Sequence, residues 1–235
     1  MGRTKRQPAA GDAQADSATK GERTRALIKS AVIELLGEKG QKFVLEDVCA
    51  RTGLTVGAFY FHFTNKDHVV EEIVIDHMRS YYGGAKDAFS NPDLFAEIFA
   101  VIWQGVMTHE ENPAIYHLPY RVIPASVRVY NEWLRVRGAM IERFARSIAN
   151  QRRGEKTIAG TDYLAAQFLM AGVEGFMENA YYGSDPLMDK IDLKPLAVSR
   201  DLSIIWYRAV LGREPDEDSV KMAIRTIAKP AAVKR

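Results

Sequence analysis

The chain has 235 residues, of which 47% are hydrophobic and 26% are charged. This is the composition of an ordinary soluble globular protein, long enough to bury a sizeable core. No apolar run approaches the roughly 18 residues of a membrane span, and the basic N-terminus lacks the apolar segment of a secretory signal. The single cysteine, Cys49, excludes an intrachain disulfide. We therefore expect a cytoplasmic protein with no membrane partner.

The net charge of +2 is unevenly distributed along the chain. Residues 1–66 carry 11 Lys/Arg and 7 Asp/Glu, a balance of +4, whereas the remainder carries 21 and 23, a balance of −2. A basic end on a near-neutral body indicates a polyanionic partner for that end. The same charge is equally compatible with a basic tail that binds nothing.

The elements expected along the chain are all helices. Residues 1–22 lack large apolar side chains, so we expect a disordered tail there. From there on, apolar residues recur at helical spacing between short Gly and Pro breaks, without β-type alternation. The expected helices cover about 24–38, 45–51, 55–61, 66–82, 91–108, 112–118, 126–152, 161–182 and 192–211. The fold class is therefore all-α.

The helices expected at 45–51 and 55–61 are joined by a tight turn. Gly53 ends the first helix, the Leu54 side chain fills the inside of the turn, and Thr55 is a good N-cap for the second helix. A helix, a short Gly-containing turn and another helix form a helix-turn-helix. In such a unit the second helix enters the major groove of DNA while the first crosses the backbone.

The second helix of this unit opens with small residues. They are Thr55, Val56, Gly57 and Ala58, and none of them has a long side chain. Small residues let the helix N-terminus and its free N–H groups lie close to phosphates and base edges. Base recognition here would rest on backbone groups, methyl contacts and DNA shape.

The stretch from Thr24 to Val70 resembles the DNA-binding domain of the TetR/AcrR family of bacterial regulators. The matching positions are Thr24-Arg25, Gly40, Asp47-Val48, Gly53, Thr55, Gly57, Tyr60, His62-Phe63 and Lys66. Beyond residue 70 the resemblance extends only to the layout of a helical bundle. It implies a DNA-binding domain at 23–66 and a ligand-binding and dimerisation domain at 67–212. From their composition, residues 1–22 are expected to be a disordered basic tail and residues 213–235 a flexible polar tail that can form one loose helix.

The resemblance also implies which residues contact the operator. Thr55, Tyr60, His62 and Lys66 occupy the positions that commonly do so, and Thr24 or Arg25 can touch a flanking phosphate. With the small residues of the helix N-terminus, the candidate DNA-binding set is Thr24, Arg25, Thr55, Val56, Gly57, Ala58, Tyr60, His62 and Lys66.

Three positions depart from the family pattern by losing a hydrogen-bonding group. Val56 replaces a frequent lysine, Ala58 replaces a frequent threonine, and Phe43-Val44 stands where the preceding helix usually starts with Thr or Ser.

The aromatic residues of the second helix are expected to separate into two faces. Phe59 and Phe63 lie four residues apart and are assigned to the core. Tyr60 lies about 100° round from Phe59 and is assigned to phosphate contact. Phe61 fits either a surface beside the operator or packing against the first helix.

The last two strong helices are the candidates for a homodimer interface. The segment 161–182 is apolar round most of its circumference, so it needs more partners than one chain offers. The alternative is that part of this surface is ordinary intrachain core. The candidate interface residues are Gly172, Gly175, Leu202, Ile205 and Trp206.

The bundle is rich in aromatic rings and methionine, which make adaptable apolar pockets. We therefore expect an apolar or aromatic small-molecule effector, although a solid core is the simpler reading of any one residue. The candidate pocket residues are Trp103, Gln104, Met107, Tyr116, His117, Arg121, Trp133, Phe168, Glu174 and Phe176.

The function expected from the whole sequence is a dimeric, ligand-responsive transcriptional regulator of double-stranded DNA, most readily a repressor. The main alternative is a DNA-binding regulator controlled by a protein partner. A second alternative is an enzyme or ligand-binding protein whose helix-turn-helix is vestigial. No catalytic motif and no metal-ligand spacing is present, so we expect no enzymatic activity, cofactor or metal.

Overall fold

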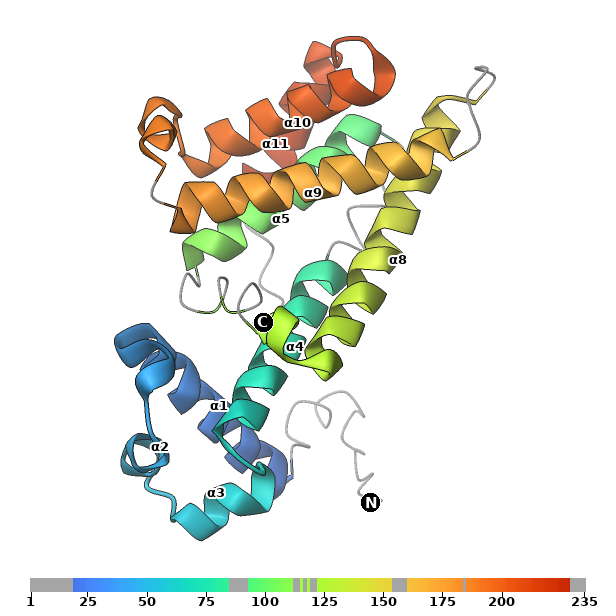
Figure 1. Cartoon of the computed structure of the whole chain (residues 1–235). Coiled ribbons are helices and arrows are strands. Elements are labelled where there is room, and N and C mark those ends of the chain that lie inside the picture. The colour runs from blue at the N-terminus through green and yellow to red at the C-terminus, as the bar shows by residue number, and fades with distance from the viewer. Residues whose placement is uncertain are drawn as a thin grey trace, which may run out of the picture. The chain divides into compact units, whose positions relative to one another are not determined.

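A computed structural model of the chain describes residues 19–84, 93–111, 115, 118, 122–153, 160–183 and 185–228. All secondary structure in these ranges is helical, which confirms the expected fold class (Figure 1). The α-helices are α1 (Lys20–Lys39), α2 (Leu45–Thr52), α3 (Val56–His62), α4 (Lys66–Gly84), α5 (Leu94–Glu111), α8 (Val127–Gln151), α9 (Thr161–Tyr182), α10 (Pro195–Leu211) and α11 (Glu217–Ala228). Short 3-10 turns are η1 (Gly40–Lys42), η3 (Ile123–Ala125) and η4 (Pro186–Lys190).

The described chain divides into two compact units. One ends at Val70 and the other begins at Glu71, so α4 contributes residues to both. In the first unit α1, α2, α3 and the start of α4 enclose one apolar core. Its buried members include Ile28, Val32, Leu35, Phe43, Val48, Phe59, Phe63 and Val69.

The first helix begins earlier than its apolar periodicity predicted. α1 starts at Lys20, four residues before Thr24 and inside the segment predicted to be disordered. The cause is a capping box, in which Thr19 Oγ1 accepts from the Glu22 N–H at 3.2 Å and the Glu22 carboxylate accepts from the Thr19 N–H at 2.7 Å. Residues 1–18 of the predicted tail lie outside the described residues.

The second unit is a bundle in which α5 packs against α10 and α11, and α8 packs against α9. α5 is buried on most sides, including Phe95, Phe99 and Ile102. The short helix predicted at 112–118 is described only at Ile115 and Leu118, which are helical and buried. Within the described ranges, no helix is long and apolar enough to cross a bilayer.

Residues 213–235 were expected to be a flexible polar tail that could include one loose helix, and a helix is present in its central part. Residues Glu217–Ala228 form α11, and Ala223 is buried against Phe95 and Phe99 of α5. The physical reason is an apolar stripe of Val220, Ala223 and Ile224 at i, i+3 and i+4, which can be buried only on one side of a helix.

Candidate nucleic-acid interface

The predicted helix-turn-helix is present between α2 and α3. Gly53 has a φ of +70°, a left-handed conformation that favours glycine, and its N–H donates to the Cys49 carbonyl at 2.9 Å. The Thr55 Oγ1 then accepts from the Ala58 N–H at 3.2 Å and caps α3. Each end of the turn therefore satisfies backbone groups that the two helices leave without intrahelical partners.

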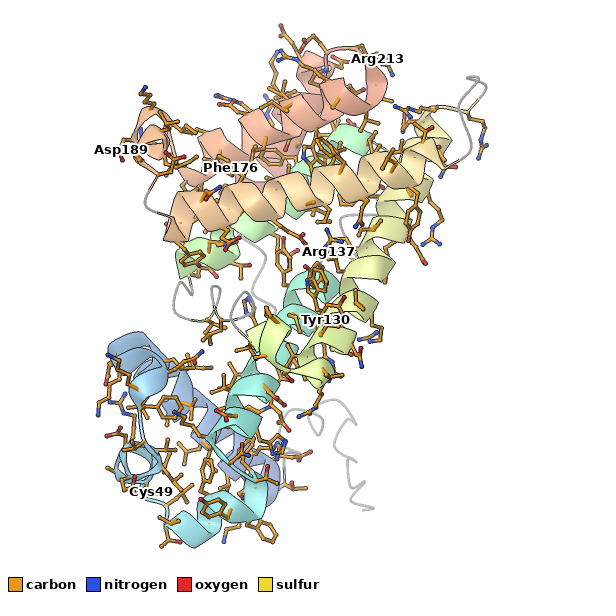
Figure 2. All side chains as sticks on the ribbon, in the orientation of Figure 1. Cys49, Tyr130, Arg137, Phe176, Asp189 and Arg213 are labelled. Carbon is orange, nitrogen blue, oxygen red and sulfur yellow. The ribbon has the colours of Figure 1, made fainter. Side chains whose placement is uncertain are left out.

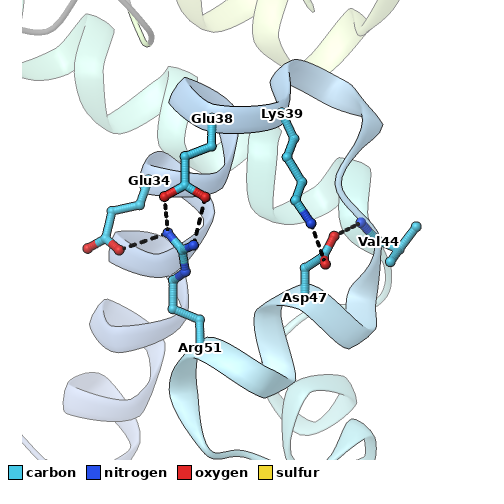
Figure 3. A network of polar contacts seen from close by, with 6 residues as sticks. All are labelled: Glu34, Glu38, Lys39, Val44, Asp47 and Arg51. Atoms are coloured by element: carbon cyan, nitrogen blue, oxygen red, sulfur yellow. Dashed lines mark hydrogen bonds and ion pairs between the residues drawn. The ribbon is translucent and has the colours of Figure 1, made fainter.

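The start of α2 shows how this chain manages without the usual Ser or Thr. The Asp47 carboxylate accepts from the Val44 N–H at 2.9 Å and from the Lys39 Nζ at 2.6 Å (Figure 3). These two donors, Lys39 first, hold the pKa of the Asp47 carboxyl below its ordinary value. The Asp47 carboxylate thus satisfies the N–H of the N-cap residue Val44, which is the half of a capping box that needs no hydroxyl at the N-cap.

A second polar contact fastens the other end of α2 to α1. The Arg51 guanidinium donates to the Glu38 carboxylate at 2.7 and 2.9 Å and to Glu34 at 3.1 Å (Figure 3). Together with the Lys39–Asp47 pair, this contact joins both ends of α2 to α1.

The aromatic residues of α3 separate into two faces, as predicted for Phe59 and Phe63. Both are 1% exposed, and their ring centroids lie 5.7 Å apart in the core. Tyr60 is 53% exposed. Phe61, which the sequence left open, is 85% exposed, and its ring meets the His62 ring edge-to-face at 5.2 Å. The outer face of α3 is therefore aromatic and exposed.

The N-terminal end of α3 is open to an approaching partner. Thr55, Val56 and Gly57 are exposed and Ala58 is partly buried. A Cβ added at Gly57 would come no closer than 3.9 Å to another atom, the Thr55 Oγ1. The protein's own packing therefore does not require glycine at this position.

Two predicted phosphate ligands also have structural roles that the sequence analysis missed. The Arg25 Nη1 donates to the His62 carbonyl at 2.6 Å, and its guanidinium lies 4.2 Å from the centroid of the Phe63 ring. The Lys66 Nζ donates to the Gln41 carbonyl at 2.8 Å and lies 5.0 Å from the Phe43 ring centroid.

The remaining two members of the predicted set lie at the ends of α1 and α3. Thr24 Oγ1 donates to the Lys20 carbonyl at 2.9 Å, and His62 is partly buried. Contact with DNA stays a prediction for all nine candidate residues.

The structure brings together only part of the predicted effector pocket. Tyr116, His117 and Arg121 lie outside the described residues. Trp133 and Glu174 both contact one buried arginine, Arg137. The other described candidates make no hydrogen bond or ring contact with Arg137. Trp103 stacks on Phe99, and the Gln104 Nε2 donates to the Tyr81 carbonyl at 3.2 Å. Met107 and Phe176 are partly buried.

Phe168 was wrongly assigned to an interior pocket. Its side chain is 75% exposed in the single chain, because it lies on the outward side of α9, opposite the buried Ala166, Leu169 and Met170. An exposed phenylalanine of this kind belongs to a surface rather than to a core cavity.

Arg137 is the functional candidate that the sequence analysis missed. It is 7% exposed and lies between α8 and α9 (Figure 2). Its Nε donates to Glu174 at 2.9 and 3.0 Å, and the Tyr82 hydroxyl donates to the same carboxylate at 3.1 Å. The signal was available, since Arg137 interrupts the apolar stripe of α8 between Trp133 and Met140 at helical spacing.

The predicted dimer residues fall into two groups. Gly172 is exposed, Gly175 and Leu202 are partly buried, and Ile205 is 56% exposed. Trp206 was wrongly assigned, because it is 4% exposed and packs edge-to-face on Phe144 at 5.4 Å. Its position on the buried side of α10 makes it core of its own chain.

Among the described residues, no group of three or more His, Cys, Asp or Glu side chains is arranged to hold a metal ion.

Comparison with known proteins identifies the N-terminal unit. The family described as "Bacterial regulatory proteins, tetR family" matches residues 28–73. A search of curated proteins found no match.

Solved structures resemble the chain over most of its length. A regulatory protein of the tetR family from Rhodococcus RHA1 has a TM-score of 0.64 at 18% identity, covering 85% of this chain and 100% of that one. Salmonella enterica GusR has a TM-score of 0.60 at 17% identity, covering 83% and 98%. SmeT, the repressor of the Stenotrophomonas maltophilia multidrug efflux pump SmeDEF, has a TM-score of 0.57 at 21% identity, covering 86% and 93%.

These likenesses establish the fold across both units, and the sequence match establishes the family of the first unit. Of these similar proteins, the Rhodococcus protein is named as a regulatory protein and SmeT as a repressor. Residues 28–73 therefore form a domain of the kind found in bacterial regulatory proteins of the tetR family, the chain has the fold of the similar tetR-family structures, and together these findings support a DNA-binding regulator.

Proposed function

We propose that the chain is a homodimeric bacterial repressor in the cytoplasm, which binds a near-palindromic operator and is released by a small-molecule effector. The observation that carries the DNA-binding part is the open N-terminal end of α3 on a packed three-helix core. A helix presented in this way fits the major groove. The repressor SmeT, which has a similar fold, supports repression as the output.

The proposed contacts with the operator follow from the two ends of α3. Thr55, Val56, Gly57 and Ala58 would face base edges, where methyl and backbone contacts dominate. Tyr60, His62 and Lys66 would contact phosphates, and so would Thr24 or Arg25 from α1. Lys66 would do so with the donor that its contacts with the Gln41 and Phe43 carbonyls leave available, because a lysine ammonium has three donors.

The proposed dimer uses the outward face of α9. Leu164 is 69% exposed and Phe168 is 75% exposed, and Gly172 continues the same side of the helix. Large exposed apolar side chains in a row indicate a protein partner, and a second copy satisfies a self-complementary face. Ile205 of α10 adds a further exposed apolar side chain to the proposed surface.

The proposed regulation is a two-state equilibrium. In one state the two α3 helices of the dimer are about 34–36 Å apart and enter successive major grooves. The effector favours another state, and the coupling between the two ligands is typically about 1–3 kcal/mol. The effector is proposed to have an aromatic or apolar body, because Tyr82 of α4 and Trp133 of α8 contact Glu174 and Arg137, and a further tyrosine lies beside each of the two rings.

A gel shift on the DNA upstream of the chain's own gene tests the proposal. Tyr60→Phe removes an exposed hydroxyl, so operator affinity should fall by about threefold to tenfold while thermal stability stays the same. Tyr130→Phe, at a 44% exposed tyrosine of α8, is the matched control and should change neither quantity. Equal affinity for Tyr60→Phe and wild type would contradict the phosphate assignment, and no binding to any upstream fragment would contradict self-regulation.

A further inference from the structure

The buried Arg137 guanidinium is only partly used by the protein. Its Nε donates to both carboxylate oxygens of Glu174, and its Nη1 donates to the Gln167 Oε1 at 3.1 Å. Among the described residues, the Nη2 donates no hydrogen bond. Since a guanidinium carries five N–H donors, three of them have no acceptor within the part of the chain that the structure describes. Arg137 is 7% exposed overall, but its Nη2 is not among the fully buried polar atoms, so water or a small molecule can reach these donors.

The acceptors around Arg137 are, by contrast, already engaged. The Glu174 carboxylate accepts from Arg137 and from the Tyr82 hydroxyl at 3.1 Å. A cationic ligand would have to compete with Arg137 for this carboxylate. A ligand with acceptor oxygens could instead accept hydrogen bonds from the remaining N–H groups of Arg137, so the site favours an anion over a cation.

The surroundings of Arg137 also favour an aromatic body on that anion. The guanidinium lies 5.2 Å from the Trp133 ring centroid, and the Tyr130 ring lies 5.9 Å from Trp133 on the same helix. Tyr81 and Tyr82 of α4 meet edge-to-face at 4.8 Å. Rings and an arginine with idle donors are the groups that hold an amphipathic acid.

We propose that Arg137 is the recognition residue for an effector carboxylate, with Trp133 beside its apolar body. The proposal rests on the proposed function and names its ligand class. The carboxylate accepts from Nη2 and from the second N–H of Nη1, and it shares the guanidinium with Glu174. Glu174 then competes with the effector carboxylate for Arg137. A stronger Glu174–Arg137 ion pair gives a weaker affinity for the effector.

The hydrogen bond from Tyr82 to Glu174 links the proposed effector site to α4. The Tyr82 hydroxyl, which donates to Glu174, lies on the helix whose first residues belong to the DNA-binding unit. A ligand carboxylate beside Glu174 repels it and weakens its bonds to Arg137 and Tyr82. Effector binding therefore changes a bond made by α4, which is the kind of differential contact that regulation requires.

A matched panel of ligands tests the charge preference in the full chain. It comprises benzoate, 2-naphthoate and decanoate, their primary amides, and the trimethylammonium compounds of the same three skeletons. Binding is measured by thermal shift and by calorimetry. The carboxylates should bind best, and Glu174→Gln should raise their affinity by about tenfold, because it removes the competing charge while keeping an acceptor for Tyr82. A gain of affinity cannot arise from misfolding.

Two arginine variants provide the loss of function and its control. Arg137→Lys keeps the positive charge but removes the paired N–H donors of the planar guanidinium, so carboxylate affinity should fall by about tenfold. Arg135→Lys, at an exposed arginine of the same helix, should leave it unchanged. Preferential binding of the ammonium series, lost in Glu174→Gln, would overturn the proposal.

Absence of carboxylate binding in both wild type and Glu174→Gln would also overturn it, and operator binding in the same samples would show that the proposed DNA-binding function stands. Carboxylate binding without release of DNA would contradict only the ligand-responsive part of the proposed function.

Discussion

Arg25 and His62 are joined by a hydrogen bond of 2.6 Å from the Arg25 Nη1 to the His62 carbonyl oxygen, across 37 residues of sequence. His62 is the last residue of α3, where carbonyl groups lack intrahelical partners and a positive charge is favourable. α3 has seven residues, too few to be stable as an isolated helix. α1 therefore holds the end of the helix that is proposed to read DNA.

Arg25→Met should destabilise α3 locally. Loss of a charge-assisted hydrogen bond and of the contact with the Phe63 ring should lower the local unfolding free energy by about 1–3 kcal/mol. Hydrogen–deuterium exchange of peptides covering α3 measures this as faster exchange, by about tenfold or more. Arg23→Met, at an exposed arginine two residues earlier on α1, is the control. Equal protection in both variants would show that the bond does not hold α3.

Gly57→Ala should separate folding from DNA binding. The added methyl meets no atom closer than 3.9 Å, and alanine in place of a helical glycine stabilises by roughly 0.5–1 kcal/mol. The melting temperature should stay the same or rise. Operator affinity should nevertheless fall, because the methyl lies on the proposed DNA-facing end of α3. Gly138→Ala on α8, where an added methyl also meets nothing within 4 Å, should leave affinity unchanged. Unaltered affinity in Gly57→Ala would argue against close approach of DNA at this residue.

The partly buried His77 and the buried His109 predict loss of stability in mild acid. Burial lowers the pKa of His77 and of His109 from 6.5 to about 4. Because the folded-state pKa lies below the unfolded one, the stabilisation is complete above pH 6.5 and is lost as the pH falls toward 4. Between pH 7.5 and 5.5 each histidine should remove about 1 kcal/mol from the unfolding free energy.

Urea titrations at the two pH values measure this loss. His77→Gln and His109→Gln should each flatten the pH dependence, and the double variant should flatten it further. Burial raises the pKa of the Glu97 carboxyl, which acts in the opposite sense and is common to all these chains. A pH dependence equal to wild type in the double variant would exclude the histidines as its source.

Phe168→Ser should weaken the proposed dimer. Removing a large exposed ring from the middle of a dimer interface commonly costs about 2 kcal/mol or more, which lowers the association constant at least about tenfold. Sedimentation equilibrium measures that constant directly. Val127→Ser, at a 77% exposed valine of α8, removes a comparably exposed apolar side chain away from α9. If the two variants associated like wild type, α9 would not form the interface.

The helix-turn-helix could be predicted because its signals are local. A glycine in the left-handed conformation, a threonine cap and an apolar spacing of four residues act within one or two helical turns, and Gly53, Thr55 and the Phe59–Phe63 pair behave as predicted. The start of α1 carried an equally local signal in Thr19 and Glu22, which the apolar periodicity did not include. The sequence alone therefore determined the fold class, the turn and the core face of α3.

Only the tertiary structure decided the roles of long polar side chains and the direction of exposed aromatic rings. Lys66 and Arg25 reach backbone carbonyls 23 to 37 residues away, and Arg137 meets a carboxylate 37 residues away. A flexible cationic side chain has the same local propensity whether it faces solvent, a carbonyl or a buried carboxylate. Phe168 and Trp206 differ in the same way, because which side of a helix is covered depends on neighbours that periodicity does not name.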